Sequence, residues 1–276
     1  MFLISPLITF YGRMRGPRVA HSIDLARLER WRSFEAEYYL LKYLVDPGRA
    51  AVDVGANEGI YSGRLSQLAP RVVSFEPIPW FADRLRRKLG RNVTVVEAAL
   101  SNRSGTAQLR IPYHEAIEMH GTSTLEAHNP LPGATRVRLI DCRLEKLDDV
   151  VEAPVGFIKI DVEGHEVPVL EGAETILRRD RPILYVETER RHNAEAPGAT
   201  FRFLQARGYT GYFLKLNRLH PLADFDVEVD QDPENVRNDH LARSPDAAGR
   251  AKKPYVNNFI FTPGWSQEEL ARATRL

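Results

Sequence analysis

Residues 50–63 read AAVDVGANEGIYSG, an apolar run that passes one aspartate and then breaks into a glycine-spaced turn. The short and nearly continuous apolar part is typical of a strand that is buried on both faces of a parallel sheet. Ser62, Leu65 and Leu68 follow the turn at helical spacing. In sheets of this kind, ligands bind where such strands end, so we expect this turn to hold one.

Two common phosphate-binding turns do not fit this stretch. The nucleotide-binding phosphate loop requires a lysine and a longer glycine spacing, and the turn has neither. The dinucleotide fingerprint requires glycines where this chain has Asn57 and Ile60. The residues therefore favour a ligand without phosphate, to which Asp53 and Asn57 offer polar groups.

The elements on either side of the turn extend the same pattern. An amphipathic helix is expected over residues 25–45, and Pro79 and Gly90 bracket another helix. Strands alternate with helices, which predicts a doubly wound α/β sheet. The further predicted strands are RVVSFEP (71–77), VTVVEAAL (93–100), VGFIKIDVEG (155–164), RPILYVE (181–187), GYTGYFLKL (208–216) and NNFIFTP (257–263).

We expect one domain over residues 1–276, with three additions to the alternating pattern. Residues 1–45 form an N-terminal helical extension. Residues 105–147 contain TAQLRIP and TRVRLIDC, whose alternation predicts added antiparallel strands around a loop that holds HGTSTLE (120–126). Residues 218–254 are polar and long for a connection, and such loops are functional or disordered.

Composition excludes several classes of protein. The net charge is +1, so the chain lacks the strongly basic surface of a nucleic-acid-binding protein, and its single Cys142 excludes a disulfide framework. The N-terminal run MFLISPLITF is too short to span a bilayer and lacks signal-peptide features, so we interpret it as a packing or weakly interfacial segment. We expect a cytoplasmic protein without an integral membrane span. The oligomeric state stays open, with a homodimer as one alternative.

The second strand supplies the residue that discriminates among ligands. Glu76 closes VVSFEP at the place where an acidic residue accepts hydrogen bonds from a ribose. Ala99 and Leu100 end the third strand with small and apolar side chains that suit the edge of an adenine. S-adenosylmethionine combines adenine, ribose, an amino acid and a sulfonium, and acidic residues near the strand ends complement its charge. A helix cap or a surface acid is the alternative role for Asp53 or Glu76 taken alone.

The motifs DVGANEG, FEP, EAALSN and, most specifically, IKIDVEGHEVPVLEGA resemble the FkbM family of S-adenosylmethionine-dependent methyltransferases. The resemblance runs from about residue 46 to residue 187 and includes the late strand NNFIFTP. It implies a Rossmann-like class I methyltransferase: a seven-stranded, mostly parallel sheet with its last strand antiparallel and helices on both faces. It also implies O-methylation of a hydroxyl on a sugar, glycan or secondary metabolite. The predicted cofactor contacts are Asp53, Gly55, Ala56, Asn57, Gly59, Glu76, Pro77, Ala99 and Leu100.

Four residues at strand ends are candidates for catalysis: Asp161, Glu163, His165 and Glu187. Asp161 has two open roles, as a base or acceptor contact and as a cofactor contact. His165 has an unperturbed pKa near 7 and is a candidate base, with a solvated helix start as the alternative. Glu163 could orient His165 or cap the helix. Asp161 and Glu187 could share a divalent ion, but no further ligand is evident, so no metal site is predicted.

Two further segments bear on the acceptor. The loop holding His120, Thr122, Ser123 and Thr124 is useful only if it folds back near the site, and a solvated connection is the alternative. Arg190 and Arg191 follow the fifth strand and could bind an acidic or phosphate-linked acceptor. The alternative is that Glu187 or Glu189 neutralises one of them. The function of a different class that we weigh is a non-catalytic S-adenosylmethionine-binding scaffold, while the lack of a basic patch speaks against a nucleic-acid methyltransferase.

Overall fold

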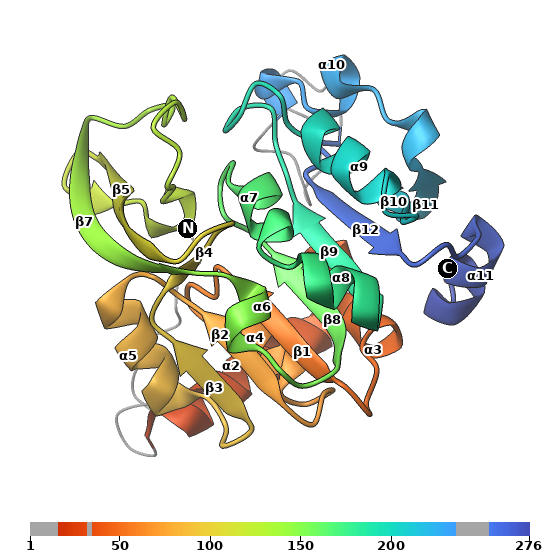
Figure 1. Ribbon diagram of the computed structural model, residues 1–276, viewed down its shortest axis with the longest axis horizontal. Helices are drawn as coiled ribbons and strands as arrows, with labels where there is room; N and C mark the ends of the chain where they lie inside the picture. The colour runs from red at the N-terminus through yellow and green to blue at the C-terminus, as the bar shows by residue number, and fades with distance from the viewer. Residues whose placement is uncertain (1–15, 32–34, 236–253) are drawn as a thin grey trace.

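A computed structural model describes residues 16–31, 35–235 and 254–276, and an eight-stranded sheet forms its centre (Figure 1). In spatial order the strands are β11 (Arg218–Pro221), β10 (Thr210–Lys215), β12 (Asn258–Thr262), β9 (Ile183–Glu187), β8 (Val155–Ile160), β1 (Ala50–Val54), β2 (Val72–Phe75) and β3 (Val93–Val96). The five strands from β9 to β3 are parallel, and β12 is antiparallel to both of its neighbours. The predicted doubly wound sheet with an antiparallel last strand is confirmed.

The predicted count of seven strands needs one correction. Strand β11 follows β10 through a tight turn in which Leu216 and Asn217 both have positive φ, and it pairs with β10 in antiparallel register. The turn allows the chain to fold straight back onto the edge of the sheet, so the start of the expected polar loop extends the sheet as an eighth strand.

Helices cover both faces of this sheet and enclose two hydrophobic clusters. One cluster joins β1, β8 and β9 to α6 (Leu147–Val150), α7 (Glu166–Glu171), α8 (Glu174–Asp180) and α9 (Gly198–Gln205). Figure 1 shows α7, α8 and α9 in front of the sheet. The other cluster joins the opposite face to η1 (Ala36–Leu40), α3 (Leu41–Leu44), α4 (Ile60–Leu65) and α11 (Gln267–Thr274). Both faces of β1, β2, β8 and nearly all of β9 are thus buried, as their near-continuous apolar sequences require, whereas the edge strand β3 is only half-buried.

The insertion forms most of a second sheet, which has four strands. Strands β5 (Gly105–His114) and β7 (Arg136–Glu145) pair in antiparallel register, and β4 (Ala99–Leu100) and β6 (Ile117–Glu118) extend the sheet on either side. The predicted third strand over residues 93–100 therefore divides, since β3 ends at Val96 and β4 joins the other sheet. Between the sheets, α5 (Pro79–Lys88) packs Phe81 against Leu109 and Ile111 of β5.

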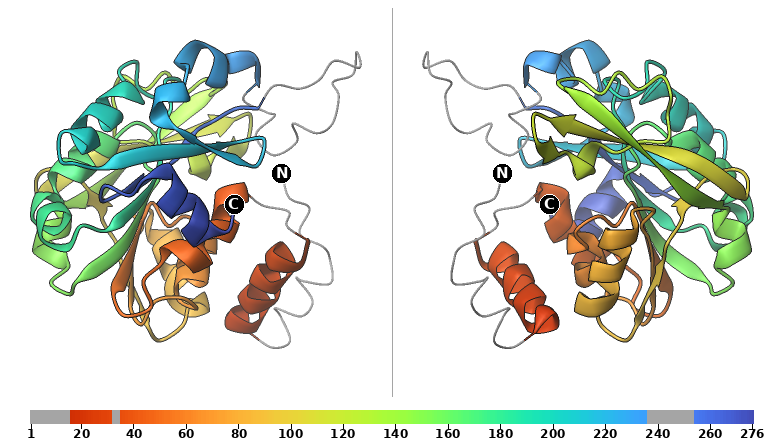
Figure 2. Two further views of the ribbon diagram at one scale, coloured as in Figure 1. Left: turned by 90° about the vertical axis from the view of Figure 1, so that its right-hand side faces the viewer. Right: turned by 90° about the vertical axis from the view of Figure 1, so that its left-hand side faces the viewer.

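The remaining segments differ in part from the sequence expectations. The expected helix over 25–45 is divided into α2 (Pro17–Trp31), η1 and α3, and Figure 2 shows α2 at the edge of the molecule. After β11 the chain forms η3 (Leu222–Asp224), α10 (Val227–Asp230) and η4 (Pro233–Asn235). The rest of the expected polar loop, 236–253, and the N-terminal run 1–10 lie outside the described residues. No helix among the described residues has the length and apolarity needed to cross a membrane.

Candidate active site

A cavity of about 650 Å³, partly open to solvent, lies at the carboxyl ends of β1, β2 and β8. The turn after β1, the end of β2, the segment 98–100, the insertion and the turn after β8 each contribute to its wall. The cavity lies at the sheet edge where open α/β folds bind their ligands.

The glycine turn after β1 forms the floor of the cavity. Gly55 has φ +79°, and a Cβ built on it would lie 1.9 Å from the carbonyl oxygen of Asp161. Only glycine therefore allows β1 and the turn after β8 to approach this closely. Asn57 follows with φ 44°, a left-handed conformation that asparagine tolerates, and both residues line the cavity.

Glu76 is held at the cavity wall by two backbone amides. The N–H groups of Asn57 and Ile78 donate to its two carboxylate oxygens at 2.7 and 2.9 Å, and the residue is 3% exposed. Burial raises the pKa of Glu76 to about 7, against the stabilising effect of these two amides. Each carboxylate oxygen keeps a free lone pair, so the group can still accept hydrogen bonds from ribose hydroxyls.

The insertion closes the cavity over its apolar end. Leu109 and Leu125 of the insertion line it opposite Ala99 and Leu100, together with Pro77. The loop that contains HGTSTLE does fold back, because His120, Gly121 and Ser123 also line the wall. The Ser123 hydroxyl oxygen is buried without a hydrogen-bond partner among the described residues. An unpaired buried hydroxyl facing a cavity fits a polar atom of a ligand.

Three residues of the predicted cofactor set do not line the cavity, namely Asp53, Ala56 and Gly59. Asp53 is fully buried and accepts a 2.6 Å hydrogen bond from the Ser62 hydroxyl. Ala56 packs against Leu85 and Leu89, and a Cβ on Gly59 would lie 2.4 Å from Leu85. The structure places these three residues behind the turn, and their contact with the cofactor stays a prediction.

Asp161 lines the cavity and is paired from behind by Lys159. The Lys159 ammonium donates to Asp161 Oδ2 at 3.0 Å and lies 3.9 Å from Asp53 Oδ1. Burial opposes the charge on Lys159, but Asp161 and Asp53 raise the pKa of the ammonium above its ordinary value. Asp161 has a side chain that is 27% exposed, so it presents a carboxylate to the cavity with its counter-charge beneath.

His165 lines the cavity, but both of its ring nitrogens are occupied. Nδ1 lies 2.6 Å from Glu126 Oε1, and Nε2 lies 3.0 Å from the Ser101 hydroxyl. The hydrogen bond from His165 lowers the pKa of Glu126. A general base needs a free lone pair within reach of the reacting proton, so this geometry favours a structural role for His165 over the predicted base.

Glu187 lies beside the cavity and does not line it. Its Oε1 accepts a 2.6 Å hydrogen bond from Asn257 Nδ2. Burial, followed by the charge of Asp161, raises the pKa of Glu187 well above its ordinary value. The half-buried Glu35, whose Oε2 accepts hydrogen bonds from Tyr61 and Tyr185, adds to this effect. Among the described residues no three metal-binding side chains converge on a common centre.

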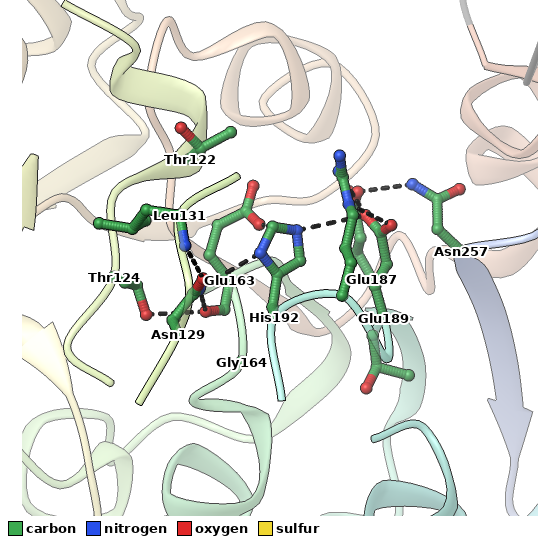
Figure 3. Close-up of polar contacts among 12 residues, drawn as sticks. Thr122, Thr124, Asn129, Leu131, Glu163, Gly164, Glu187, Glu189, His192 and Asn257 are labelled. Carbon is green, nitrogen blue, oxygen red and sulfur yellow. Dashed lines mark hydrogen bonds and ion pairs between the residues drawn. The ribbon is translucent and has the colours of Figure 1, made fainter. Parts of the chain in front are cut away.

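Glu163 lines the cavity and contacts a histidine that lies behind it (Figure 3). His192 Nε2 lies 2.6 Å from Glu163 Oε2 and 3.6 Å from Glu189 Oε1. Burial raises the pKa of Glu163. The backbone carbonyl of Glu163 accepts hydrogen bonds from Thr124 Oγ1 at 2.7 Å and from Asn129 Nδ2 at 3.0 Å. The insertion therefore fixes the turn that carries Glu163.

The two arginines after β9 have carboxylate partners within the chain. Arg191 binds Glu189 through Nε at 2.5 Å and Nη2 at 2.8 Å. Arg190 forms a two-point pair with Glu228 of α10. The pairing of Arg191 with Glu189 follows the alternative given above, and neither guanidinium is left as a ready contact for an anionic acceptor.

Sequence reasoning missed three residues of this site: Lys159, Asn129 and His192. Lys159 lies inside the motif IKIDVEGHE, where a lysine among buried apolar residues was the available signal. His192 was noted only as a neighbour of the arginines, and Asn129 lies in an irregular loop without a pattern. Their roles arise from contacts between segments distant in the sequence.

One family model matches this chain, and the chain is also similar to proteins named as methyltransferases. A profile of the methyltransferase FkbM domain matches residues 53–210, more than half of the chain. The chain is 30% identical to methyltransferase sdnD of Sordaria araneosa over 159 residues, which cover 45% of this chain and 60% of that protein. It is 28% identical to 2-O-methyltransferase NoeI of Sinorhizobium fredii over 173 residues, which cover 56% of this chain and 69% of that protein.

A solved structure of methyltransferase FkbM from Methylobacillus flagellatus KT aligns with a TM-score of 0.48 at 15% identity. The alignment covers 84% of this chain and 50% of that one. The chain therefore spans less than two thirds of the length of sdnD and about half of the length of this solved protein.

Proposed function

Since this chain belongs to the FkbM family of S-adenosylmethionine-dependent methyltransferases, we propose that it O-methylates a hydroxyl of a sugar, a glycan or a secondary metabolite. One observation carries the proposal. The cavity at the sheet edge has Glu76, a carboxylate that can accept hydrogen bonds from a ribose, on one side and the carboxylates of Asp161 and Glu163 on the other. When bound, the cofactor supplies a sulfonium methyl group that passes to the acceptor oxygen, while the sulfur keeps the bonding electron pair.

The residues of the cavity divide the work between binding and chemistry. Glu76 holds the ribose, and Leu109, Leu125 and Leu100 enclose the base. Lys159 donates to only one oxygen of Asp161, namely Oδ2. The other carboxylate oxygen attracts the positive charge of the cofactor. Glu163 stands ready to take the proton of the acceptor hydroxyl. Alignment of the reacting atoms by these contacts supplies most of the rate enhancement expected for a displacement at carbon.

The acceptor is better described as neutral than as acidic. Arg190 and Arg191, the residues that would have bound an anionic group, are paired with Glu228 and Glu189. The carboxylates around the cavity would repel a carboxylate or phosphate on the acceptor. The name of the relative NoeI, a 2-O-methyltransferase, supports a hydroxyl as the acceptor group. Action in the cytoplasm remains part of this proposal.

A transfer assay with methyl-labelled S-adenosylmethionine tests the function. The full chain is incubated with panels of neutral and acidic glycans and polyketide alcohols, and label in the products is measured by mass spectrometry. Binding of S-adenosylhomocysteine is measured in parallel by calorimetry. We expect binding together with transfer to a neutral hydroxyl. Binding without transfer to any panel member would favour the non-catalytic scaffold, and absence of binding would refute both functions.

A further inference from the structure

His192 lies at the centre of a buried row of charged side chains that starts at the cavity with Glu163 and ends at Glu189. The residue is 3% exposed and belongs to the segment after β9. Figure 3 shows its imidazole between Glu163 and Glu189. Of this group only Glu163 lines the cavity. The far end of the row is closed, because Glu189 accepts hydrogen bonds from Arg191 and from the Tyr255 hydroxyl at 2.8 and 2.6 Å.

The contacts of Asn129 fix which nitrogen of His192 faces Glu163. Asn129 Oδ1 accepts a hydrogen bond from the Leu131 N–H at 3.0 Å, and its Nδ2 donates to the Glu163 carbonyl at 3.0 Å. These two contacts orient the amide, so Nδ2 also faces His192 Nδ1 at 3.2 Å. Nδ1 is therefore placed to accept, and the proton of the neutral ring resides on Nε2. The imidazolium also carries a hydrogen there, so in either state an N–H at Nε2 lies against Glu163 Oε2, with the two heavy atoms 2.6 Å apart.

The two oxygens of the Glu163 carboxylate have different environments. Oε2 faces His192 Nε2, whereas Oε1 has no hydrogen-bond partner among the described residues and is not a buried atom. The residue itself sits at φ 54°, a strained conformation for a side chain of this kind. Hydrogen bonds from Thr124 and Asn129 to its carbonyl hold it there. One oxygen is thus anchored and the other is open to the cavity.

We propose that His192 is a positioning residue that anchors Glu163 as the proton acceptor of methyl transfer, with Glu189 and Asn129 holding the imidazole in place. This inference rests on the proposed function. As the acceptor oxygen forms its bond to the methyl carbon, its O–H bond breaks and the proton passes to Glu163 Oε1. The carboxylic acid formed there then releases the proton to solvent through the open side of the cavity.

The charges around His192 support an anchoring role. Glu163 and Glu166 face it from the turn after β8 and the start of α7, Glu189 and Arg191 from its own segment, and Tyr255 from the segment before β12. Burial opposes ionisation of the ring, but Glu163 and Glu189 raise the pKa of His192 above its ordinary value. The imidazolium would carry a hydrogen on Nδ1 that faces the Asn129 Nδ2 donor, so the Asn129 contact belongs to the neutral ring. Glu189 stays ionised, because contacts with His192 and Arg191 outweigh its burial and lower its pKa to about 2. A lasting counter-charge therefore keeps the Nε2 hydrogen in place.

Nitrogen-15 NMR of the histidine rings tests the anchor without any acceptor. We expect His192 Nε2 to carry a hydrogen at pH 7 and its nitrogen signal to shift in Glu163→Gln. The pKa of the His192 ring should also be lower in that variant. Because Glu163 lines the cavity, saturation with S-adenosylhomocysteine should also shift this signal. The exposed His114 serves as the reference ring in the same spectra. An unprotonated Nε2, or a His192 signal that responds neither to Glu163→Gln nor to S-adenosylhomocysteine, would overturn the proposal.

Two substitutions of His192 separate positioning from folding. His192→Gln keeps a neutral N–H donor near the Nε2 position, whereas His192→Phe removes it. With the hydroxyl acceptor found for the parent protein, we expect His192→Phe to lower kcat about 100-fold with KM for S-adenosylmethionine within twofold, and His192→Gln to recover at least tenfold of that loss. His114→Gln is the matched control. Equal kcat in the parent and His192→Phe would refute the anchor while leaving the methyltransferase function intact.

Discussion

The ammonium nitrogen of Lys159 lies 3.0 Å from Asp161 Oδ2, and only 4% of the lysine side chain is exposed. A cavity-lining carboxylate thus has its counter-ion inside the protein and not in solvent. Asp53 lies on the same ammonium at 3.9 Å and is fully buried. Lys159 is therefore the positive charge that makes two neighbouring carboxylates compatible with burial at the end of β8.

Removal of this cation should destabilise the protein strongly. Lys159→Met leaves the buried carboxylate of Asp53 without a counter-charge, and breaking a buried pair in this way costs about 3–5 kcal/mol. The free energy of unfolding from urea titration measures the effect, with the exposed Lys42→Met as the control. A loss below 1 kcal/mol would show that Lys159 does not stabilise these carboxylates.

Cofactor affinity should depend on pH through Glu76. The pKa of this residue is about 7 in the free protein, and ribose hydroxyls donate best to the ionised form. Protonated Glu76 must therefore lose its proton on binding, so affinity for S-adenosylhomocysteine rises with pH and levels off above 7. Calorimetry should give affinity about tenfold weaker at pH 6 than at pH 8. Glu76→Gln should flatten this profile, and a profile unchanged in Glu76→Gln would assign the dependence elsewhere.

The same carboxylate should account for much of the ribose contact. Glu76→Ala removes a hydrogen-bonded charged group and should weaken S-adenosylhomocysteine binding by about 1.5–3 kcal/mol. NAD should not bind to the parent protein, since the turn lacks the glycines that admit a pyrophosphate. Tight NAD binding in the same calorimeter would contradict the assignment of the cavity.

Glu166 should make the folded state less stable at alkaline pH. Burial raises its pKa to about 8 from an ordinary value near 4.5. A carboxyl with a raised folded pKa contributes stability that is complete below pH 4.5 and is lost as pH rises toward 8. Glu166→Gln imitates the protonated acid and should remove this loss. Its stability relative to the parent should increase from pH 5 to pH 8.5, by up to roughly 1.4 kcal/mol per unit of pKa shift. A constant difference in urea unfolding across this range would contradict the expectation.

Ser123 should matter for the cofactor and not for the fold. Its hydroxyl oxygen is buried and has no hydrogen-bond partner in the part of the chain that the structure describes, and the residue lines the cavity. Ser123→Ala should leave the free energy of unfolding unchanged or raise it, because it removes an unsatisfied group. The same change should weaken S-adenosylhomocysteine binding by about 0.5–1.5 kcal/mol. Ser104 is exposed, so Ser104→Ala is the control. Unchanged affinity in Ser123→Ala would show that the Ser123 hydroxyl does not contact the cofactor.

Local patterns were sufficient for the sheet and for one half of the cavity. The apolar run before Gly55 and the carboxylate of Glu76 belong to strand ends, and parallel strands bring their carboxyl ends to one edge by geometry alone. Asp53 shows what this reasoning leaves open, namely the direction of a side chain at a strand end. Its place in the strand was predictable, but the alternation of side chains directs it beneath the turn, onto Ser62 and Lys159.

The part of the site around Glu163 depends on contacts that no local pattern records. The proposed anchor joins the turn after β8, the insertion and the segment after β9 through Glu163, Asn129 and His192. His165 was the more conspicuous histidine in the motif, yet Ser101 and Glu126 occupy both of its nitrogens. The eighth strand was missed because the turn at Leu216 and Asn217 uses left-handed residues without a glycine.

The hydrogen bonds from Thr124 and Asn129 to the Glu163 carbonyl also bear on how such enzymes diversify. An inserted sheet is an attractive cassette for exchange between homologues, since both of its ends leave the main body near one place. In this protein, however, the insertion also supports the turn after β8, because Thr124 and Asn129 bond the carbonyl of Glu163. Replacing residues 105–147 with a homologous insertion that lacks these two side chains would keep a cavity wall but remove the hydrogen bonds that hold the Glu163 turn. Changes elsewhere in the insertion can therefore reshape the cavity wall, while Thr124 and Asn129 are needed to hold the turn that carries Glu163.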